Sequence, residues 1–299
     1  MRYIARIIAR NDFLLAKLKS LWIQTTLFAS SQLQITSSYE IANGRVDTSK
    51  NTKSRDILEI LKFLRAKNIS GGNLVRIGPY GEGGYIILDM LAKLNTVISI
   101  GIGKDTSFEE DMNSKLNHTS IFHLFDHTDV PLRQLPKNFN FYSKGIASET
   151  NEELNLLSLE NIVDMCLNEK SIPLLKIDVD GAEYEALSKI SRKSFSRFEQ
   201  IVIEFHDLKG ENTLNGKFHE ILKTLNEDFF VIHLHPNNFE PWIVINGFSL
   251  PNVLEVTFLN RKYLKLTDKQ LVVFPRNLDA PNNLETEMIL GAFYFPDPE

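Results

Sequence analysis

The sequence contains a single cysteine, Cys166, among its 299 residues. One thiol cannot form an internal disulfide, so the chain fits a reducing compartment and we expect a cytoplasmic location. The apolar residues around Cys166 favour a buried structural thiol on a helix, because free cysteines are among the most buried residues.

Long apolar runs are also missing. No stretch of about 18 apolar residues exists, which argues against a transmembrane helix. Charges interrupt the N-terminal apolar stretch, so we expect no secretory signal peptide. The formal net charge is −5, and no overall basic surface suggests a nucleic-acid partner. Internal repeats and low-complexity tracts are absent. Hydrophobic residues make up 43% of the chain, which is ample for the core of one large or two small domains.

Apolar residues recur at helical spacing within residues 1–22, and basic residues occupy the opposite face. The apolar residues are Ile4, Ile7, Ile8, Leu14, Leu15, Leu18 and Trp22, and the basic ones are Arg2, Arg6, Arg10 and Lys17. We expect an amphipathic helix that packs on the domain or on a homodimer partner. Peripheral contact with an anionic membrane surface is an alternative, and a free segment is another. Residues 29–54 are polar and typical of a linker, so we expect an N-terminal segment at 1–54 and one domain at 55–299.

The rest of the chain is organised around residues 172–185. Leu174 to Val179 form an apolar, β-branched run that is long enough for one buried strand. Asp178, Asp180 and Gly181 follow, and then a helical pattern begins. Two acids that are two residues apart point the same way on an extended backbone, and they repel each other unless a cation lies nearby. The alternative interpretation is that Asp180 caps the helix and Asp178 holds a loop.

Strand and helix patterns alternate along the chain, which predicts a doubly wound, mainly parallel α/β sheet. The expected strands are 96–100, 121–126, 139–143, 174–179, 200–205, 229–235 and 254–259. The expected helices are 54–64, 154–167 and 218–225. No helix separates the last two strands, so we expect the seventh strand to be antiparallel.

A glycine turn follows the first of these strands. Gly101 and Gly103 allow the backbone to pass close to a ligand, and Thr106 or Ser107 can cap the next helix. Asp126 ends the second strand, where an acid holds a ribose diol in mononucleotide-type sites. Thr106 stands where a third glycine would complete a dinucleotide motif. The pattern therefore favours an adenosine without phosphates over a dinucleotide.

A second glycine-rich segment lies at 74–88, where two apolar runs flank Gly78, Gly81, Gly83 and Gly84. It is typical of a surface hairpin loop. It is also typical of a backbone that approaches a ligand. Its position just upstream of the first core strand favours the second interpretation.

Residues 175–187, Leu-Lys-Ile-Asp-Val-Asp-Gly-Ala-Glu-Tyr-Glu-Ala-Leu, resemble the acidic-turn signature of FkbM-type S-adenosylmethionine-dependent methyltransferases. The segments 76–78, 83–85, 201–208, 235–238 and 278–283 are similar to others of that group, so the resemblance spans roughly 70–285. It implies a class I methyltransferase (Rossmann-like) fold with a seven-stranded, mostly parallel sheet, usually methylating an oxygen of a sugar or other small secondary metabolite. The expected cofactor contacts are Gly101, Gly103, Asp105, Asp126, His127, Gly83, Gly84, Tyr85 and Asp178. Asp180 departs from the family, which usually has glutamate there.

Methyl transfer to a hydroxyl requires in-line positioning and the removal of a proton. Acids and imidazoles gather at the predicted strand ends, and the candidate catalytic residues are His206, Asp178, Asp180 and Glu204. We favour His206 as a base that titrates near neutral pH. The alternative is Mg²⁺ or Mn²⁺ held by Asp178, Asp180 and Glu204. The candidate substrate-binding residues are His233, His235, Asn237, Asn238 and Trp242, with 236–251 as a lid that also carries Phe239.

The sequence thus predicts an O-methyltransferase that acts on a sugar or a surface-glycan precursor. One rival hypothesis is a metal-dependent glycosyltransferase that binds a nucleotide-sugar through Asp178 and Asp180. That hypothesis leaves Gly101, Gly103 and Asp126 without a role. Another rival is a non-catalytic adenosine-binding subunit, against which the acids and histidines at the strand ends argue.

Overall fold

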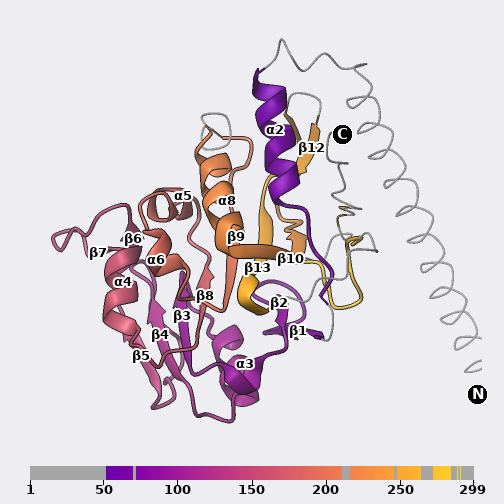
Figure 1. Cartoon of the computed structure of the whole chain (residues 1–299). Coiled ribbons are helices and arrows are strands. Elements are labelled where there is room, and N and C mark those ends of the chain that lie inside the picture. Colours follow the sequence, from indigo (N-terminus) through magenta and orange to yellow (C-terminus); the bar gives the residue numbers. More distant parts are fainter. Residues whose placement is uncertain are drawn as a thin grey trace, which may run out of the picture.

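A seven-stranded sheet forms the centre of the computed structural model, in the order β10-β13-β9-β8-β3-β4-β5 (Figure 1). The structure describes residues 52–69, 72–210, 216–245, 248–263, 272–283, 288 and 290. The predicted N-terminal helix and nearly all of the linker therefore lie outside the described residues. The strands are β3 (Thr96–Ile100), β4 (Ile121–Phe125), β5 (Phe139–Tyr142), β8 (Pro173–Ile177), β9 (Gln200–Phe205), β10 (Phe229–Pro236) and β13 (Leu254–Asn260).

Strands β5, β4, β3, β8 and β9 pair in parallel, whereas β13 is antiparallel to both β9 and β10. The prediction of a mostly parallel class I methyltransferase sheet with an antiparallel seventh strand is confirmed. Strand β9 has the predicted bounds, and β13 extends the predicted strand by one residue. The alternation of apolar and turn-forming segments was sufficient to predict these central strands.

Helices cover both faces of the sheet (Figure 1). On one face the largest core cluster packs under α2 (Thr52–Phe63), α4 (Leu159–Cys166), α5 (Glu183–Leu187) and α8 (Lys217–Asp228). On the other face a second cluster packs under α3 (Ser107–Lys115) and the hairpin of β1 (Leu74–Ile77) and β2 (Tyr85–Leu88). Smaller elements are α6 (Arg192–Phe195), the parallel pair β6 (Gly145–Ala147) and β7 (Leu156–Ser158), η2 (Leu91–Lys93) and η3 (Arg261–Tyr263).

Two predicted segments differ from the structure. The helix expected at 154–167 begins only at Leu159, because Ser158 caps it by accepting from the Asn161 backbone N–H and the residues before Ser158 form β7. The loop expected at 236–251 contains an antiparallel hairpin of β11 (Trp242–Ile245) and β12 (Phe248–Pro251). Cys166 ends α4 and is buried, as predicted, and burial raises the pKa of its thiol to about 12.

Within the described part of the chain, no helix has the length and apolar character needed to cross a membrane. The carboxyl ends of β3, β4, β8, β9 and β10 meet at one edge of the sheet, where the antiparallel β13 begins. Residues that follow these strands are therefore gathered at a single edge.

Candidate active site

The turn after β3 requires glycine at two positions for different reasons. Gly101 has a φ of 76°, and a Cβ there would lie 1.7 Å from the Asp178 carbonyl oxygen. Gly103 has a φ of 56°, but no heavy atom lies within 4 Å of a Cβ built there. Gly101 thus packs the first turn against the acidic turn after β8, and Gly103 borders open space. Both observations fit a backbone that approaches a ligand.

Asp126 fixes that turn from the end of β4. Its Oδ2 accepts from the Gly103 N–H at 2.8 Å, and its Oδ1 accepts three bonds, from the Thr128 N–H and hydroxyl and from the Asp129 N–H. Burial disfavours the ionised carboxyl, but these bonds outweigh it and lower the pKa of Asp126. Because a carboxylate oxygen has about two lone pairs, only Oδ2 retains capacity for a ribose hydroxyl.

A cavity of about 600 Å³ extends from this turn along the carboxyl edge of the sheet. Small-molecule sites in proteins typically measure about 300–1,000 Å³, so the cavity suits a nucleoside-sized ligand. Its apolar lining includes Ile102, Phe125 and Ile146, and its polar lining includes Asp126 and Asp178. The residues present therefore fit the adenosine of S-adenosylmethionine.

The other predicted cofactor residues divide into two groups. Gly83, Asp105 and His127 line the cavity. Asp105 also performs the capping expected of Thr106 or Ser107, because its carboxylate accepts from the Ser107 N–H and hydroxyl. Gly84 and Tyr85 do not line the cavity. A Cβ on Gly84 would meet the Pro79 carbonyl oxygen at 2.1 Å, and Tyr85 is buried beneath the acidic turn.

Tyr85 connects two of the predicted catalytic acids. Its hydroxyl donates to Asp178 Oδ2 at 2.8 Å and lies 2.9 Å from Glu204 Oε2. A phenol has one hydrogen, so it cannot donate fully to both carboxylates. Burial, followed by the charges of Asp178 and Glu255, raises the pKa of Glu204 well above its usual value.

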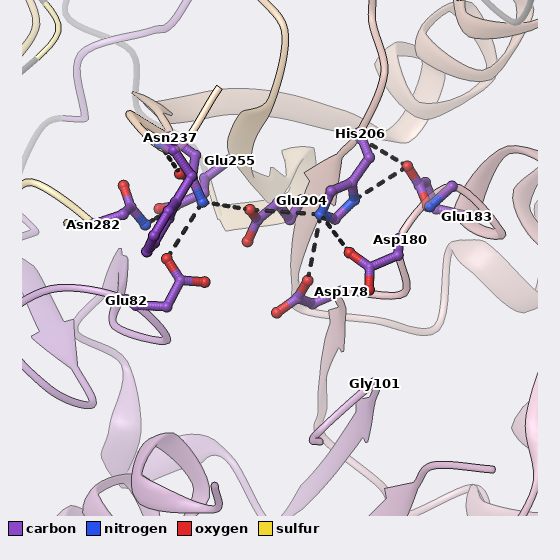
Figure 2. A network of polar contacts seen from close by, with 12 residues as sticks. Glu82, Gly101, Asp178, Asp180, Glu183, Glu204, His206, Asn237, Glu255 and Asn282 are labelled. Atoms are coloured by element: carbon purple, nitrogen blue, oxygen red, sulfur yellow. Dashed lines mark hydrogen bonds and ion pairs between the residues drawn. The ribbon is translucent and has the colours of Figure 1, made fainter. Parts of the chain in front are cut away.

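His206 follows β9 and lies among four carboxylates (Figure 2). Its Nε2 is 3.8 Å from Asp178 Oδ1, 3.4 Å from Asp180 Oδ1 and 3.7 Å from Glu204 Oε1. Burial opposes the charged ring, but Glu183, Glu204 and Asp178 together raise the pKa of His206 to about 9. We predicted titration near neutral pH. The structure instead favours the imidazolium at pH 7–8, because carboxylates stabilise the cation more than burial disfavours it.

Asp178 and Asp180 come together in a different way from the one we predicted, which was a shared direction on an extended strand. Strand β8 ends at Ile177, so the Asp178–Asp180 pair is not on extended backbone. Asp180 has a φ of 46°, and its side chain is 97% exposed. It does not cap α5, for which Ala182 is the N-cap without a side-chain bond. Asp178 and Asp180 meet only because both approach the His206 ring.

Glu183 was not predicted, although it is central to the geometry. Its side chain is fully buried, Oε2 accepts from the Gly181 N–H at 2.7 Å, and Oε1 accepts from the His206 N–H at 2.8 Å. Oε1 also lies 3.5 Å from His206 Nδ1. Glu183 thus joins the acidic turn to the end of β9. Its place three residues after Asp180, in the first turn of a helix, was the available signal, because acids there accept from exposed helix N–H groups.

The predicted metal ligands are partly brought together. Asp178, Glu204 and His206 each offer a ligand atom within 4.8 Å of the others, and Asp180 lies beside this group. Two carboxylates and an imidazole fit Mn²⁺ well, and carboxylates also suit Mg²⁺. The residues of this cluster are therefore compatible with a divalent cation as well as with an imidazole base.

The predicted substrate residues lie mostly behind the cavity. His233 and His235 are each 2% exposed, and their rings lie 3.0 Å from Asp279 Oδ1 and 3.2 Å from Glu255 Oε2, respectively. Asn238 is held by hydrogen bonds with Asn283. Asn237 does reach the site, because its amide donates to Glu204 Oε1 at 2.8 Å. Trp242 remains partly exposed, at 38%.

Comparison with known families finds one similar family. Residues 90–232 match the model of the methyltransferase FkbM domain. The matched segment, which is just under half of the chain, is similar to FkbM methyltransferase domains. The matched range includes the glycine turn, Asp126, the acidic turn, Glu204 and His206. It excludes the β1–β2 hairpin and everything after Ile232, in the middle of β10. The resemblance noted in the acidic turn is thereby confirmed.

Several solved structures are similar to part of the chain. One is a putative rRNA-methylase from Clostridium thermocellum, at 12% identity, with 57% of this chain and 90% of that chain covered and a TM-score of 0.34. Another is the precorrin-6y C5,15-methyltransferase from Geobacter metallireducens GS-15, at 14% identity. The match covers 57% of this chain and 86% of that chain, with a TM-score of 0.32. A third is the Methanococcus jannaschii fibrillarin pre-rRNA processing protein, at 9% identity. The match covers 65% of this chain and 84% of that chain, with a TM-score of 0.28.

No curated protein matches the sequence. The TM-scores of the three solved structures are all below 0.5, so they carry no argument about the acceptor. The similarity to methyltransferases therefore rests on the match of residues 90–232 to the FkbM model.

Proposed function

We propose that the protein is an S-adenosylmethionine-dependent O-methyltransferase that methylates a hydroxyl of a sugar or of a glycan precursor. The observation that carries the proposal is the position of Asp178. This residue lines the 600 Å³ cavity that suits the cofactor, and it also approaches the His206 ring at 3.8 Å. A methyl donor in the cavity and a group able to take a proton would therefore meet at one carboxylate.

The cofactor, when bound, supplies an electrophilic methyl group on a sulfonium. The chain's own residues would then orient it. Asp126 would receive a ribose hydroxyl through Oδ2, and the Gly103 backbone would pass close to the ligand because no side chain intervenes. Buried Lys176 donates to the Gly101 carbonyl and pairs with Asp178 at 3.5 Å, which fixes both turns with respect to each other. These contacts leave the cavity preformed.

His206 is our proposed base. With a pKa of about 9, roughly a tenth of the rings are neutral at pH 8. Because only the neutral ring can accept a proton, the reaction loses about tenfold in rate, or about 1.4 kcal/mol in activation free energy. This loss is small beside the 10²–10⁴-fold rate gain typical of general base catalysis. A divalent cation held by Asp178, Glu204 and His206 is the alternative, since a metal would acidify the acceptor hydroxyl directly.

The glycosyltransferase hypothesis is not retained. It required Asp178 and Asp180 to act together on a diphosphate, but Asp180 is almost fully exposed whereas Asp178 is bonded to Tyr85. The family match supports a methyltransferase instead.

Ligand-dependent stabilisation tests the proposal. We expect S-adenosylhomocysteine at 100 times its Kd to raise the free energy of unfolding by about 2.7 kcal/mol. UDP and NAD at the same concentration should leave the thermal midpoint unchanged. Stabilisation by UDP or NAD without stabilisation by S-adenosylhomocysteine would contradict the proposed function.

A further inference from the structure

The cavity contains a lysine whose charge is buried. Lys176 lies on β8, is 4% exposed and lines the cavity beside the turns after β3 and β8. Burial opposes the cation, but the charges of Asp178, Glu109 and Glu204 outweigh this cost and raise the pKa of Lys176. The ammonium is therefore a cation at neutral pH, although lysine is almost never fully buried in proteins.

The ammonium of Lys176 retains hydrogen-bonding capacity. It donates to the Gly101 carbonyl oxygen at 3.3 Å and to Asp178 Oδ2 at 3.5 Å, and both distances are long for hydrogen bonds. The ring centroids of Tyr85 and Phe108 lie 5.2 Å and 6.0 Å from its Nζ. An ammonium has three hydrogens, and the third has no acceptor among the residues that the structure describes. A ligand with a strong acceptor can use this hydrogen.

Acids dominate the rest of the lining. Seven acids, Glu82 of the loop between β1 and β2 among them, line the cavity together with three lysines and one histidine. Of the other lysines, Lys104 is exposed and pairs with Asp129, and Lys144 pairs with Glu152. S-adenosylmethionine carries a sulfonium, an ammonium and one carboxylate. The acids suit its two cationic groups, whereas the carboxylate requires a cation, and Lys176 is the one that lies where screening by water is weakest.

The strand order places this cation at the amino-acid end of the cofactor. Asp126 follows β4, Gly101 follows β3 and Lys176 lies on β8, and these strands are neighbours in the order β4-β3-β8. In the proposed function the ribose lies at Asp126, and the methyl group points toward His206, which follows β9 beyond β8. Figure 2 shows Asp178 between Gly101 and His206. The chain from the ribose to the carboxylate therefore extends over β3 toward β8, across two strand spacings of together about 10 Å.

We propose that Lys176 binds the carboxylate of S-adenosylmethionine through its third N–H and thereby selects the complete cofactor over adenosine analogues that lack this group. The assignment rests on the proposed function and names the residue that recognises the amino-acid end of the ligand. The contacts with Gly101 and Asp178 hold the ammonium in place before the ligand arrives, which reduces the entropy lost on binding.

Calorimetry on the full chain tests Lys176 with two ligands, S-adenosylhomocysteine and an analogue in which a hydrogen replaces the carboxylate. The analogue keeps the adenosine, the thioether and the amine. We expect the wild type to bind S-adenosylhomocysteine at least about tenfold more tightly than the analogue, which corresponds to 1.4 kcal/mol. Lys176→Gln should abolish this preference by weakening S-adenosylhomocysteine alone. Any change in the field of the nearby acids acts on the amine of both ligands and cancels in their ratio.

Lys104→Gln is the matched control, because Lys104 also lines the cavity but is exposed and paired with Asp129. It should keep the wild-type preference. Equal affinity of the wild type for the two ligands, an equal loss of both in Lys176→Gln, or loss of the preference in Lys104→Gln would overturn the assignment of Lys176. Absence of S-adenosylhomocysteine binding by the wild type defeats the proposed function itself, and the assignment with it.

A second measurement needs no variant, since removal of a buried cation leaves its acid partners uncompensated and can unfold the chain. Lys176 is the buried lysine of the described part of the chain, so its ammonium hydrogens should exchange slowly with water. NMR of the wild type labelled with the heavy nitrogen isotope at lysine Nζ detects such a protected ammonium. S-adenosylhomocysteine should shift its resonance strongly and the analogue only weakly. Equal shifts with the two ligands contradict a contact between Lys176 and the carboxylate.

Discussion

Replacement of His206 by glutamine should remove a defined part of the pH dependence of stability. The surrounding acids raise the pKa of this ring from 6.5 to about 9. A group with a raised folded-state pKa stabilises the fold fully below its unfolded pKa, and this contribution is lost as the pH rises through the folded value. The shift corresponds to about 3 kcal/mol. We therefore expect the wild-type free energy of unfolding to fall by about 3 kcal/mol more than that of His206→Gln between pH 6.5 and pH 9.5.

Urea denaturation in EDTA, at half-unit steps from pH 6 to pH 9.5, measures this difference. EDTA keeps cations away from the neighbouring carboxylates. His118→Asn is the matched control, because His118 is exposed and its φ of 57° suits asparagine. The control should follow the wild type at every pH. Parallel curves for the wild type and His206→Gln across this range would refute the idea that the carboxylates around His206 hold it as a cation.

Three further predictions concern ligands. Gly101→Ala should weaken S-adenosylhomocysteine binding more than tenfold in calorimetry, because the new Cβ would lie 1.7 Å from the Asp178 carbonyl oxygen. The control is Gly216→Ala, where φ is 81° and the space around the Cβ is open, and this variant should bind S-adenosylhomocysteine normally. Asp126→Ala should cost about 1.5–3 kcal/mol of the same affinity, the range for a charged hydrogen bond, and an unchanged Kd rejects the ribose assignment. If Asp178, Glu204 and His206 hold a cation, Mn²⁺ binding detected by electron paramagnetic resonance should disappear in Asp178→Asn. It should persist in Asp180→Asn, because the Asp180 side chain is exposed. Equal loss of Mn²⁺ binding in both variants contradicts this ligand set.

The central strands were predictable because each is a short apolar run that ends in turn-forming residues. β9 and β13 are the clearest cases, since continuous burial removes any ambiguity about which face is apolar. The start of α4 was harder, because Leu156 and Leu157 suit a helix as well as a strand. Pairing with β6 decides their conformation, and each paired residue lies eleven positions earlier in the chain.

The site was predictable only in part. Period-two spacing places His233 and His235 on one face of β10, but it does not reveal whether that face meets the substrate or the protein interior. Contacts with Asp279 and Glu255 decide this, and both are distant in the sequence. Glu82 was missed for a similar reason. Its loop was recognised through its glycines, and only the folded hairpin brings its one acid to the cavity.

The place of β13 in the sheet has a consequence for biosynthesis. This strand is the last of the seven in the chain, yet it lies between β9 and β10 and pairs with both (Figure 1). Until residue 260 has left the ribosome, β9 presents an unpaired edge and β10 lacks the strand with which it pairs in the described structure. Open edges invite pairing with other chains. A nascent chain that pauses before β13 is therefore the species most exposed to aggregation, and the one for which chaperone binding matters most.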